Sequence, residues 1–256
     1  MDILEVKALN KVYSGKVATH ALTDIHLTIR RGEFVGIMGP SGSGKTTLLN
    51  MVSTIDRPSS GEVRIGGINP YNMKKRELAH FRRKQLGFVF QDFNLLDTLT
   101  VAENIVLPLT LDRRPLKEAE ARLAQTAAKL GIGGILNKRV YEISGGQRQR
   151  TAIARAIIGS PVLLLADEPT GALDSQSSRA VMESLAEINE QDGTTLMLVT
   201  HDPVAASYCN RIVFIKDGKL AAEIHCGENR QAFFQRIIDM LSFWGGDNRE
   251  LSSIRV

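Results

Sequence analysis

A glycine-rich stretch followed by a lysine and a threonine has the composition and spacing of a phosphate-binding loop. Its glycines allow several backbone N–H groups to converge on phosphate oxygens, at the positive end of the helix that follows. We predict that Lys45 reaches the β- and γ-phosphates of a nucleoside triphosphate and that the Thr46 hydroxyl binds Mg²⁺. The stretch consists of Gly39, Pro40, Ser41, Gly42, Ser43, Gly44, Lys45 and Thr46, with Thr47 adjoining the same site.

Two adjacent carboxylates, Asp167 and Glu168, end the apolar run Val162–Ala166. A carboxylate at the carboxyl end of a buried strand, beside a phosphate loop, stands where a partner for Mg²⁺ is needed. We predict that Asp167 holds the ion through a water molecule. Glu168, one position further, is predicted to polarise the attacking water as general base. The alternative for either residue is a helix-capping acid.

Gln91 and His201 follow two further predicted core strands, Leu86–Phe90 and Thr195–Thr200. We predict that Gln91 contacts Mg²⁺ and the attacking water, and that it joins the nucleotide mechanically to the helical segment that begins there. The imidazole of His201 is predicted to touch the γ-phosphate and to orient Glu168 or the water. The alternatives are a surface glutamine and a structural histidine.

A second glycine-rich motif, Ser144, Gly145, Gly146 and Gln147, begins the predicted helix Gly146–Ile158. A serine hydroxyl, bare backbone N–H groups and the helix dipole all suit an anion. Because the chain already has one complete phosphate loop, we expect this motif to hold the γ-phosphate bound by another copy. Two copies packed head to tail would then enclose two ATP molecules, each motif supplying transition-state charge in trans. A plain N-cap followed by a glycine turn is the alternative.

Two further segments are candidates for contacts around the nucleotide. Tyr13 follows the first predicted strand, and an aromatic ring there can stack on adenine, worth about 1–3 kcal/mol by analogy with base stacking. Core packing is the alternative for Tyr13. Gly171–Asp174 follows the two carboxylates closely, and we expect it to contact the partner chain and to tie the two sites together.

The elements that must position these residues predict the α/β fold class. We expect a P-loop ATPase core with a mainly parallel sheet, a small antiparallel β-subdomain and a helical insert subdomain. Alternating segments at Ile3–Leu9 and Leu22–Ile29 predict the antiparallel strands, and Phe34–Met38 predicts a buried strand. The other predicted elements are helices Val101–Val106, Leu116–Leu130 and Ser175–Glu190 and strands Arg211–Lys216 and Lys219–Ile224.

These elements divide the chain into three predicted parts. Residues 1–91 and 161–226 form the ATPase core, residues 92–160 the helical subdomain, and residues 227–256 a C-terminal helical tail. The tail has one apolar helical face, which we expect to pack on its own domain rather than to dock a partner. That face consists of Phe233, Phe234, Ile237, Ile238 and Leu241.

The composition of the 256-residue chain, 43% hydrophobic and 23% charged, is that of an ordinary soluble globular protein. No apolar run approaches the roughly 18 residues needed to span a bilayer, and the acidic N-terminus is unlike a signal peptide. The two cysteines, Cys209 and Cys226, have no metal-ligand spacing and fit a reducing cytosol. The net charge of +4 is weak evidence for nucleic acid, so we expect no nucleic-acid partner.

In this order, the motifs resemble those of the nucleotide-binding subunits of ATP-binding cassette (ABC) transporters, over nearly all of residues 2–225. The resemblance implies ATP and Mg²⁺ as ligands, catalytic roles for Glu168, His201 and Gln91, and an ATP-dependent dimer. It also implies an integral-membrane permease as partner, which would place the chain at the cytoplasmic face of a bacterial cell membrane. The signature motif of the family corresponds to Ile143–Gln147. The chain departs from the family at Arg139–Glu142, where a Tyr-Pro pair often precedes the signature, and this departure bears only on local loop geometry.

A finer resemblance comes from Gly87–Gln91 with Phe93–Leu96 and Leu99–Asn104, which are similar to ATPases of lipoprotein release, macrolide efflux and antimicrobial-peptide resistance. Thr200–Cys209 and Arg230–Gln235 narrow the likeness to bacitracin-type peptide-resistance ATPases, which often work beside a sensor histidine kinase. The alternatives are a lipoprotein-release or macrolide-efflux ATPase and a signalling module for such a kinase. A soluble cassette protein of translation or DNA repair fits less well, because those usually carry two cassettes or a long coiled-coil insertion.

Overall fold

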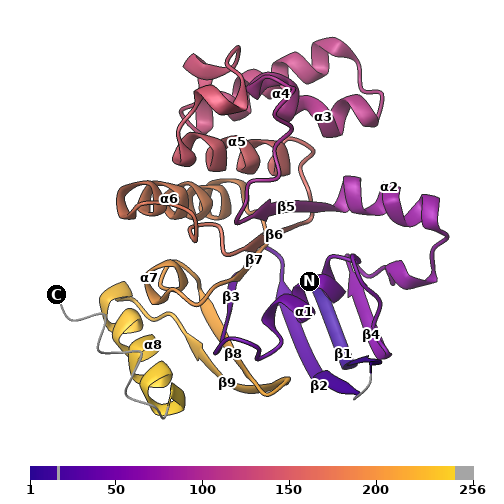
Figure 1. Cartoon of the computed structure of the whole chain (residues 1–256), viewed down its shortest axis with the longest axis vertical. Coiled ribbons are helices and arrows are strands. Elements are labelled where there is room, and N and C mark those ends of the chain that lie inside the picture. Colours follow the sequence, from indigo (N-terminus) through magenta and orange to yellow (C-terminus); the bar gives the residue numbers. More distant parts are fainter. Residues whose placement is uncertain (16–17, 246–256) are drawn as a thin grey trace.

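The computed structural model describes residues 1–15 and 18–245, and its centre is a six-stranded sheet in the order β5-β6-β7-β3-β8-β9 (Figure 1). Neighbouring strands run parallel except at one edge, where β9 pairs antiparallel with β8. The strands are β3 (Phe34–Met38), β5 (Leu86–Phe90), β6 (Leu163–Asp167), β7 (Leu196–Val199), β8 (Arg211–Lys216) and β9 (Lys219–His225).

A second, three-stranded antiparallel sheet has the order β2-β1-β4 and consists of β1 (Asp2–Tyr13), β2 (Thr19–Arg30) and β4 (Ser60–Ile65). Apolar and polar residues alternate along β2, so one face is buried and the other faces solvent. The two predicted strands are confirmed, and both extend further than predicted because β-bulges carry β1 through polar residues. β4 was missed, since only Val63 and Ile65 of its six residues are buried.

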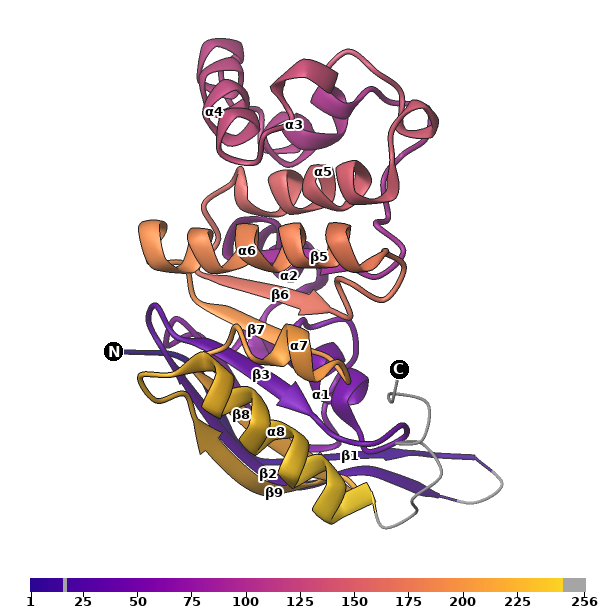
Figure 2. The ribbon, with the colours of Figure 1, turned by 90° about the vertical axis from the view of Figure 1, so that its left-hand side faces the viewer.

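The helical insert gathers at one end of the molecule, above α6 (Ser175–Asp192) and the sheet (Figures 1 and 2). It contains α3 (Val101–Leu111), α4 (Leu116–Lys129), α5 (Gly145–Ile157) and the short 3₁₀ turns η2 (Gly133–Ile135) and η3 (Val140–Glu142). A capping box begins α3, in which the Thr100 hydroxyl and the Glu103 side chain bond each other's backbone N–H. The predicted helices are confirmed, with ends that differ by a few residues.

Both faces of the large sheet are covered, which explains its nearly continuous apolar strands. Phe34 and Leu164 point into one core, which they share with α3, α5 and α6. Val35 and Leu165, one position further along the same strands, point into a second core with helix α1 (Lys45–Val52) and the small sheet. The two cores fix the carboxyl ends of β3, β5, β6 and β7 along one edge of the sheet.

The C-terminal helix α8 (Arg230–Gly245) covers part of the sheet beside β9 and the short helix α7 (Pro203–Ala206). Phe233 and Ile237 are fully buried there, so the predicted apolar face packs on its own chain. Residues 246–256 of the predicted tail lie outside the described part of the structure. The remaining helical elements are η1 (Pro70–Asn72) and α2 (Lys75–Gln85). Within the described residues, no helix combines the length and apolar character needed to cross a membrane.

Candidate nucleotide site

The predicted phosphate loop joins β3 to α1, and its glycines are required by the chain's own backbone. A Cβ atom on Gly39 would lie 2.1 Å from the carbonyl oxygen of Ile215. Gly44 precedes α1 with φ of +108°, and a Cβ atom there would lie 2.6 Å from the carbonyl oxygen of Ala21. Backbone atoms cannot move aside as a side chain can, so only glycine fits at these positions. The loop is therefore held as a tight turn at the positive end of α1.

Lys45 lies across this loop, where its ammonium group donates to the carbonyl oxygens of Gly39 at 2.8 Å and Pro40 at 2.9 Å. Burial lowers the pKa of Lys45, against the opposite effect of the Glu168 and Asp167 charges. The Ser43 hydroxyl is buried with no hydrogen-bond partner among the described residues. A part-buried ammonium beside an orphaned hydroxyl fits an anionic ligand such as a triphosphate. Of the other loop residues, Pro40, Ser41, Gly42 and Thr46 are exposed, and Thr47 is half-buried.

Asp167 ends β6 and is half-buried, next to β5 through its pairing with Phe90. Burial raises the pKa of Asp167, the Glu168 charge raises it further, and Lys45 acts in the opposite direction. Two carboxylates thus share one ammonium group, an excess of negative charge that fits a divalent cation. Within residues 1–15 and 18–245, no three His, Cys, Asp or Glu side chains cluster as a metal site. The two carboxylates beside the phosphate loop suit Mg²⁺, which takes many of its ligands from phosphate and water.

The structure brings Glu168 and His201 into direct contact. Oε1 of Glu168 lies 2.7 Å from Nδ1 of His201, and Oε2 accepts a hydrogen bond of 3.0 Å from the Thr200 hydroxyl. The Glu168 side chain is 17% exposed and that of His201 is 75% exposed. Glu168 has φ of +45°, a left-handed conformation that is costly for a residue other than glycine and is often found at functional sites. Thr200, which was not predicted, was detectable as the last polar residue before His201.

Gln91 leaves β5 and packs against the loop that follows Glu168, since a Cβ atom on Gly171 would lie 2.9 Å from its Cδ. A residue that the sequence did not reveal holds the same two segments together. The fully buried Gln149 of α5 donates from Nε2 to the carbonyl oxygens of Phe90 at 3.2 Å and Pro169 at 2.6 Å. An isolated glutamine on the inward face of a helix was the signal that could have found it.

The second glycine-rich motif begins α5 as a capping box. The Ser144 hydroxyl accepts a hydrogen bond of 3.3 Å from the N–H of Gln147, and the Gln147 side chain accepts one of 3.0 Å from the N–H of Ser144. A Cβ atom on Gly146 would lie 2.9 Å from Oγ of Ser177, so this glycine lets α5 approach α6 closely. In one chain the motif is therefore an N-cap. The sheet separates α5 from α1 in both views, so the motif does not reach its own phosphate loop (Figures 1 and 2).

Tyr13 ends β1 and is 40% exposed, so the alternative of core packing is wrong for this residue. The ammonium group of Lys11 lies 4.7 Å from the centroid of its ring. Asp174 caps α6, because its Oδ1 accepts a hydrogen bond of 2.9 Å from the N–H of Ser177. Leu173 lies close to Gly145, whose Cβ atom would be 3.2 Å from its Cδ2. The segment that was predicted to contact a partner chain thus lies beside the motif at the start of α5.

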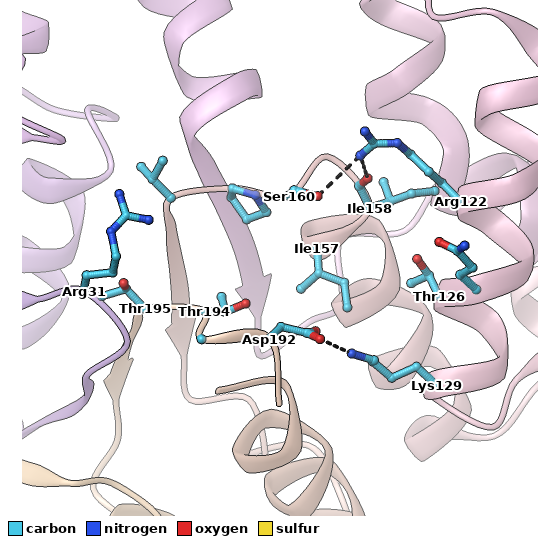
Figure 3. A pocket seen from close by; sticks show the side chains of 14 residues that line it. Arg31, Arg122, Thr126, Lys129, Ile157, Ile158, Ser160, Asp192, Thr194 and Thr195 are labelled. Carbon is cyan, nitrogen blue, oxygen red and sulfur yellow. Dashed lines mark hydrogen bonds and ion pairs between the residues drawn. The ribbon is translucent and has the colours of Figure 1, made fainter. Parts of the chain in front are cut away.

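A cavity of about 630 Å³ lies at the opposite edge of the sheet and plays no part in this cluster (Figure 3). Two of its lining residues, Arg31 and Thr195, precede β3 and β7, whereas the predicted site residues follow the carboxyl ends of these strands. Lys129 of α4 forms an ion pair with Asp192 across it, and Arg122 of α4 donates to the carbonyl oxygen of Ile158. The cavity marks the joint between α4 and the core rather than a nucleotide site.

The fold and this edge cluster define a P-loop nucleotide hydrolase with a helical insert, and comparisons with known proteins identify its kind. A family model described as "ABC transporter" matches residues 22–171. The ABC transporter ATP-binding protein YxdL of Bacillus subtilis is 60% identical over 255 residues, covering 100% of this chain and 99% of that protein. The bacitracin export ATP-binding protein BceA of Halalkalibacterium halodurans is 50% identical over 248 residues, covering 96% and 98%.

A solved structure agrees with these relatives. The dimeric structure of the ATP-binding cassette MJ0796 of Methanocaldococcus jannaschii, in a post-hydrolysis state bound to ADP and Pi, superposes with a TM-score of 0.80. The two proteins share 40% sequence identity, over 88% of this chain and 100% of that chain. This chain belongs to the ATP-binding cassette proteins of the ABC transporter family. It is an ATPase that uses ATP and Mg²⁺, and cassettes of this family hydrolyse ATP to drive transport through membrane permease components.

Proposed function

We propose that this chain is the ATP-hydrolysing subunit of a permease that confers resistance to bacitracin-like antimicrobial peptides. The support for the substrate class is the 50% identity to a bacitracin export ATP-binding protein over nearly the whole chain. In this proposal the chain acts at the cytoplasmic face of a bacterial cell membrane, and a sensor histidine kinase is a further partner. Residues 1–91 and 161–226 serve as the ATPase core, residues 92–160 as the signature subdomain and residues 227–256 as the tail.

The proposed roles follow from the contacts at the carboxyl edge of the sheet. Lys45 and the loop N–H groups bind the phosphates, and Glu168 takes the proton of the attacking water while His201 holds its Oε1. Mg²⁺, when bound, offsets phosphate charge, and Thr46, Gln91 and Asp167 are the residues that would hold it, Asp167 through water. The single observation that carries the hydrolytic proposal is the contact of Glu168 with Thr200 and His201, which fixes both oxygens of its carboxylate beside the end of β7.

We further propose that two copies join head to tail, so that Ser144, Gly145, Gly146 and Gln147 of one copy complete the site of the other. The dimeric structure of the related cassette MJ0796 supports this arrangement. In the single chain Ser144 is exposed at the start of α5, and α5 and α1 pack on opposite faces of the large sheet (Figure 2). A γ-phosphate held by one copy would then meet the start of α5 from its partner.

Mixing two inactive variants tests the head-to-tail arrangement. Lys45→Ala and Ser144→Ala are each expected to lower ATP turnover strongly when assayed alone. In a mixed dimer one site receives Lys45 and Ser144 from the two unaltered halves, and the other site receives both substitutions. Turnover should therefore recover on mixing, in proportion to the mixed dimers formed. If each chain built its whole site alone, mixing would restore nothing.

A groove beside Gln91 is the proposed docking surface for the permease. It encloses about 480 Å³ between α2, β5, α3 and α5, and its lining combines apolar side chains with three arginines. We propose that it receives a short amphipathic helix of the permease that carries an acidic residue, because arginines favour a carboxylate partner. Its lining includes Ile55, Arg82, Arg83, Phe88, Phe90, Leu107, Leu111 and Arg155.

The variant Leu111→Asp tests this surface, since Leu111 is 57% exposed at the groove. A carboxylate there should abolish co-purification with the permease and leave the ATPase activity of the isolated chain unchanged. The matched control is Leu116→Asp, at a leucine that is 73% exposed and does not line the groove. Equal loss of the permease in both variants would contradict the assignment of the groove.

Deleting the gene and restoring it tests the substrate class. The deletion strain should become sensitive to bacitracin, and a wild-type copy should restore resistance whereas Glu168→Gln should not. Sensitivity to a macrolide instead would favour the efflux alternative. A reporter gene controlled by the kinase separates transport from signalling. If the peptide still activates this reporter in the Glu168→Gln strain, signalling does not need ATP hydrolysis.

A further inference from the structure

Lys11 is a charged residue in β1 that is only 9% exposed, close to the proposed adenine contact. Its side chain lies on the same side of the strand as Tyr13, two residues further on. Nζ lies 2.8 Å from Oδ2 of Asp56, 2.7 Å from the carbonyl oxygen of Arg57 and 4.7 Å from the centroid of the Tyr13 ring. A lysine ammonium has three N–H donors, and these three neighbours provide one acceptor for each.

The contact between Lys11 and Tyr13 occupies one face of the aromatic ring. A cation over a ring face is attracted by the π electrons, most strongly where water is excluded, as it is around a lysine buried to this degree. Tyr13 is the last residue of β1 and is 40% exposed, so part of its ring is open to solvent. The ammonium therefore holds the ring in place and leaves the opposite face available.

The other two contacts of Lys11 connect Tyr13 to the phosphate loop. Asp56 and Arg57 follow α1, the helix that begins at Lys45, and the N–H of Asp56 donates to the carbonyl oxygen of Asn50 in that helix. The hydrogen bond from Lys11 lowers the pKa of Asp56, against the effect of burial, and bonds from Arg57 and Tyr13 lower it further. Asp56 is thus a carboxylate at neutral pH and a firm anchor for the ammonium group.

We propose that Lys11 is a positioning residue for adenine: its ammonium group holds one face of the Tyr13 ring, so that the opposite face is presented to the base of an ATP whose phosphates lie in the loop before α1. This inference rests on the role proposed for Tyr13. A ring that is already ordered loses less side-chain freedom when the base stacks on it, which strengthens binding without a direct contact from Lys11 to ATP.

Equilibrium binding of ATP and of inorganic triphosphate, measured in EDTA so that hydrolysis does not run, tests the proposal. Lys11→Met should weaken ATP binding by about threefold to tenfold, the range expected for loss of a cation–π support. Binding of inorganic triphosphate should not change, because that ligand has no base. The matched control is Lys7→Met on the same strand, whose exposed ammonium pairs with Glu5, and it should leave both affinities unchanged.

A double-mutant cycle separates positioning from support of the fold. In a Tyr13→Ala background, Lys11→Met should cause no further loss of ATP affinity, and Lys11→Arg in the wild-type background should recover part of it. An equal loss for ATP and inorganic triphosphate would overturn the proposal, since Lys11 would then support the phosphate loop. An unchanged ATP affinity in Tyr13→Ala would overturn it together with the role of Tyr13, whereas retained turnover in that variant would leave the ATPase function standing.

Asp56→Asn provides a second route if Lys11→Met does not fold. This variant keeps the ammonium group but weakens its anchor and the bond between Asp56 and Tyr13, so it should reduce ATP affinity by a smaller factor and leave triphosphate affinity unchanged. An ATP affinity equal to that of the wild type in Asp56→Asn would overturn the proposal.

Discussion

The two glycine-rich loops of this cassette differ in what surrounds their glycines. In the phosphate loop, Cβ atoms on Gly39 and Gly44 would strike backbone oxygens of other strands of the same chain. In the motif that begins α5, a Cβ atom on Gly145 would lie closest to Cδ2 of Leu173, and one on Gly146 closest to the side chain of Ser177. The backbone of the phosphate loop is thus fixed by the strands packed against it. The Ser144 motif is held by its capping box and packs against side chains, which can change rotamer.

This contrast indicates how the two loops are used. The phosphate loop has a buried hydroxyl without a described partner and a lysine whose ammonium bonds two main-chain carbonyls of the loop, which are features of an incomplete anion site. In the Ser144 motif, side chains of the motif itself accept the N–H groups of Ser144 and Gln147. We infer that the first loop is preformed for its ligand, and that the second acquires a ligand only when another molecule brings one to it.

The largest expected effect belongs to Glu168→Gln. The amide keeps the shape of the side chain but is a poor base, so ATP turnover should fall by about a hundredfold to ten-thousandfold. ATP affinity should be preserved, because the phosphate loop is unaltered, and the dimer should persist with nucleotide. Phosphate release and size-exclusion chromatography measure these outcomes. Turnover at the wild-type rate would show that Glu168 is not the general base. It would also remove the reason for His201 to orient Glu168.

A matched pair of alanine substitutions tests the contrast itself. Gly44→Ala combines a strained positive φ with a backbone collision and should destabilise the protein by about 3 kcal/mol. ATP binding should be lost with it. Gly145→Ala meets only the end of the Leu173 side chain, so the isolated chain should bind ATP normally while the dimer hydrolyses it more slowly. Thermal unfolding and ATP titration distinguish them, and a loss of ATP binding in Gly145→Ala would erase the difference between the loops.

Gln149 lies in α5, the helix that begins with the Ser144 motif, and it bonds the segments that carry Gln91 and Glu168. Its replacement therefore tests whether the motif and the nucleotide site are coupled through this residue. Gln149→Leu removes the donor to the carbonyl oxygens of Phe90 and Pro169, which should cost about 1–3 kcal/mol of stability. Turnover should fall more than ATP affinity, since Gln91 and Glu168 adjoin those two carbonyls. Gln149→Glu should be worse than Gln149→Leu, because it points a buried carboxylate at two acceptors. Equal effects of the two variants would argue against this hydrogen-bond bridge.

Much of this organisation could be predicted from the sequence, because its signals are local. The strand before the phosphate loop, the helix after it and the carboxylates at the end of β6 each follow from neighbouring residues. β4 was missed because Ser60, Gly61 and Glu62 interrupt its alternation. Lys11 and Gln149 were missed for another reason: their partners lie more than 40 and at least 20 residues away in sequence, so only the folded chain brings them together.

The smallest effects concern two aspartates, one in each region, whose carboxyl pKa values shift in opposite directions. Burial, helped by Glu168, raises the pKa of Asp167. The contribution of Asp167 to stability is therefore complete below the pKa that its carboxyl has in the unfolded chain. It is lost as the pH rises through the pKa of the same carboxyl in the folded protein. Hydrogen bonds from the backbone and side chain of Ser177 lower the pKa of Asp174, so its contribution is present at neutral pH and is lost as the solution is acidified.

Replacing each carboxylate by an amide should reveal these signs. Asp167→Asn should raise the melting temperature of the nucleotide-free protein at pH 7, with a gain that shrinks as the solution is acidified and the aspartate itself becomes protonated. The same variant should lose the further stabilisation by ATP with Mg²⁺, because a neutral amide cannot offset the ion. Asp174→Asn should lower the melting temperature slightly at pH 7 and keep the nucleotide effect. Scanning calorimetry across pH measures both, and destabilisation by Asp167→Asn at pH 7 would mean that Lys45 outweighs burial at this carboxylate, so that the phosphate-loop region holds no excess of charge for a cation to offset.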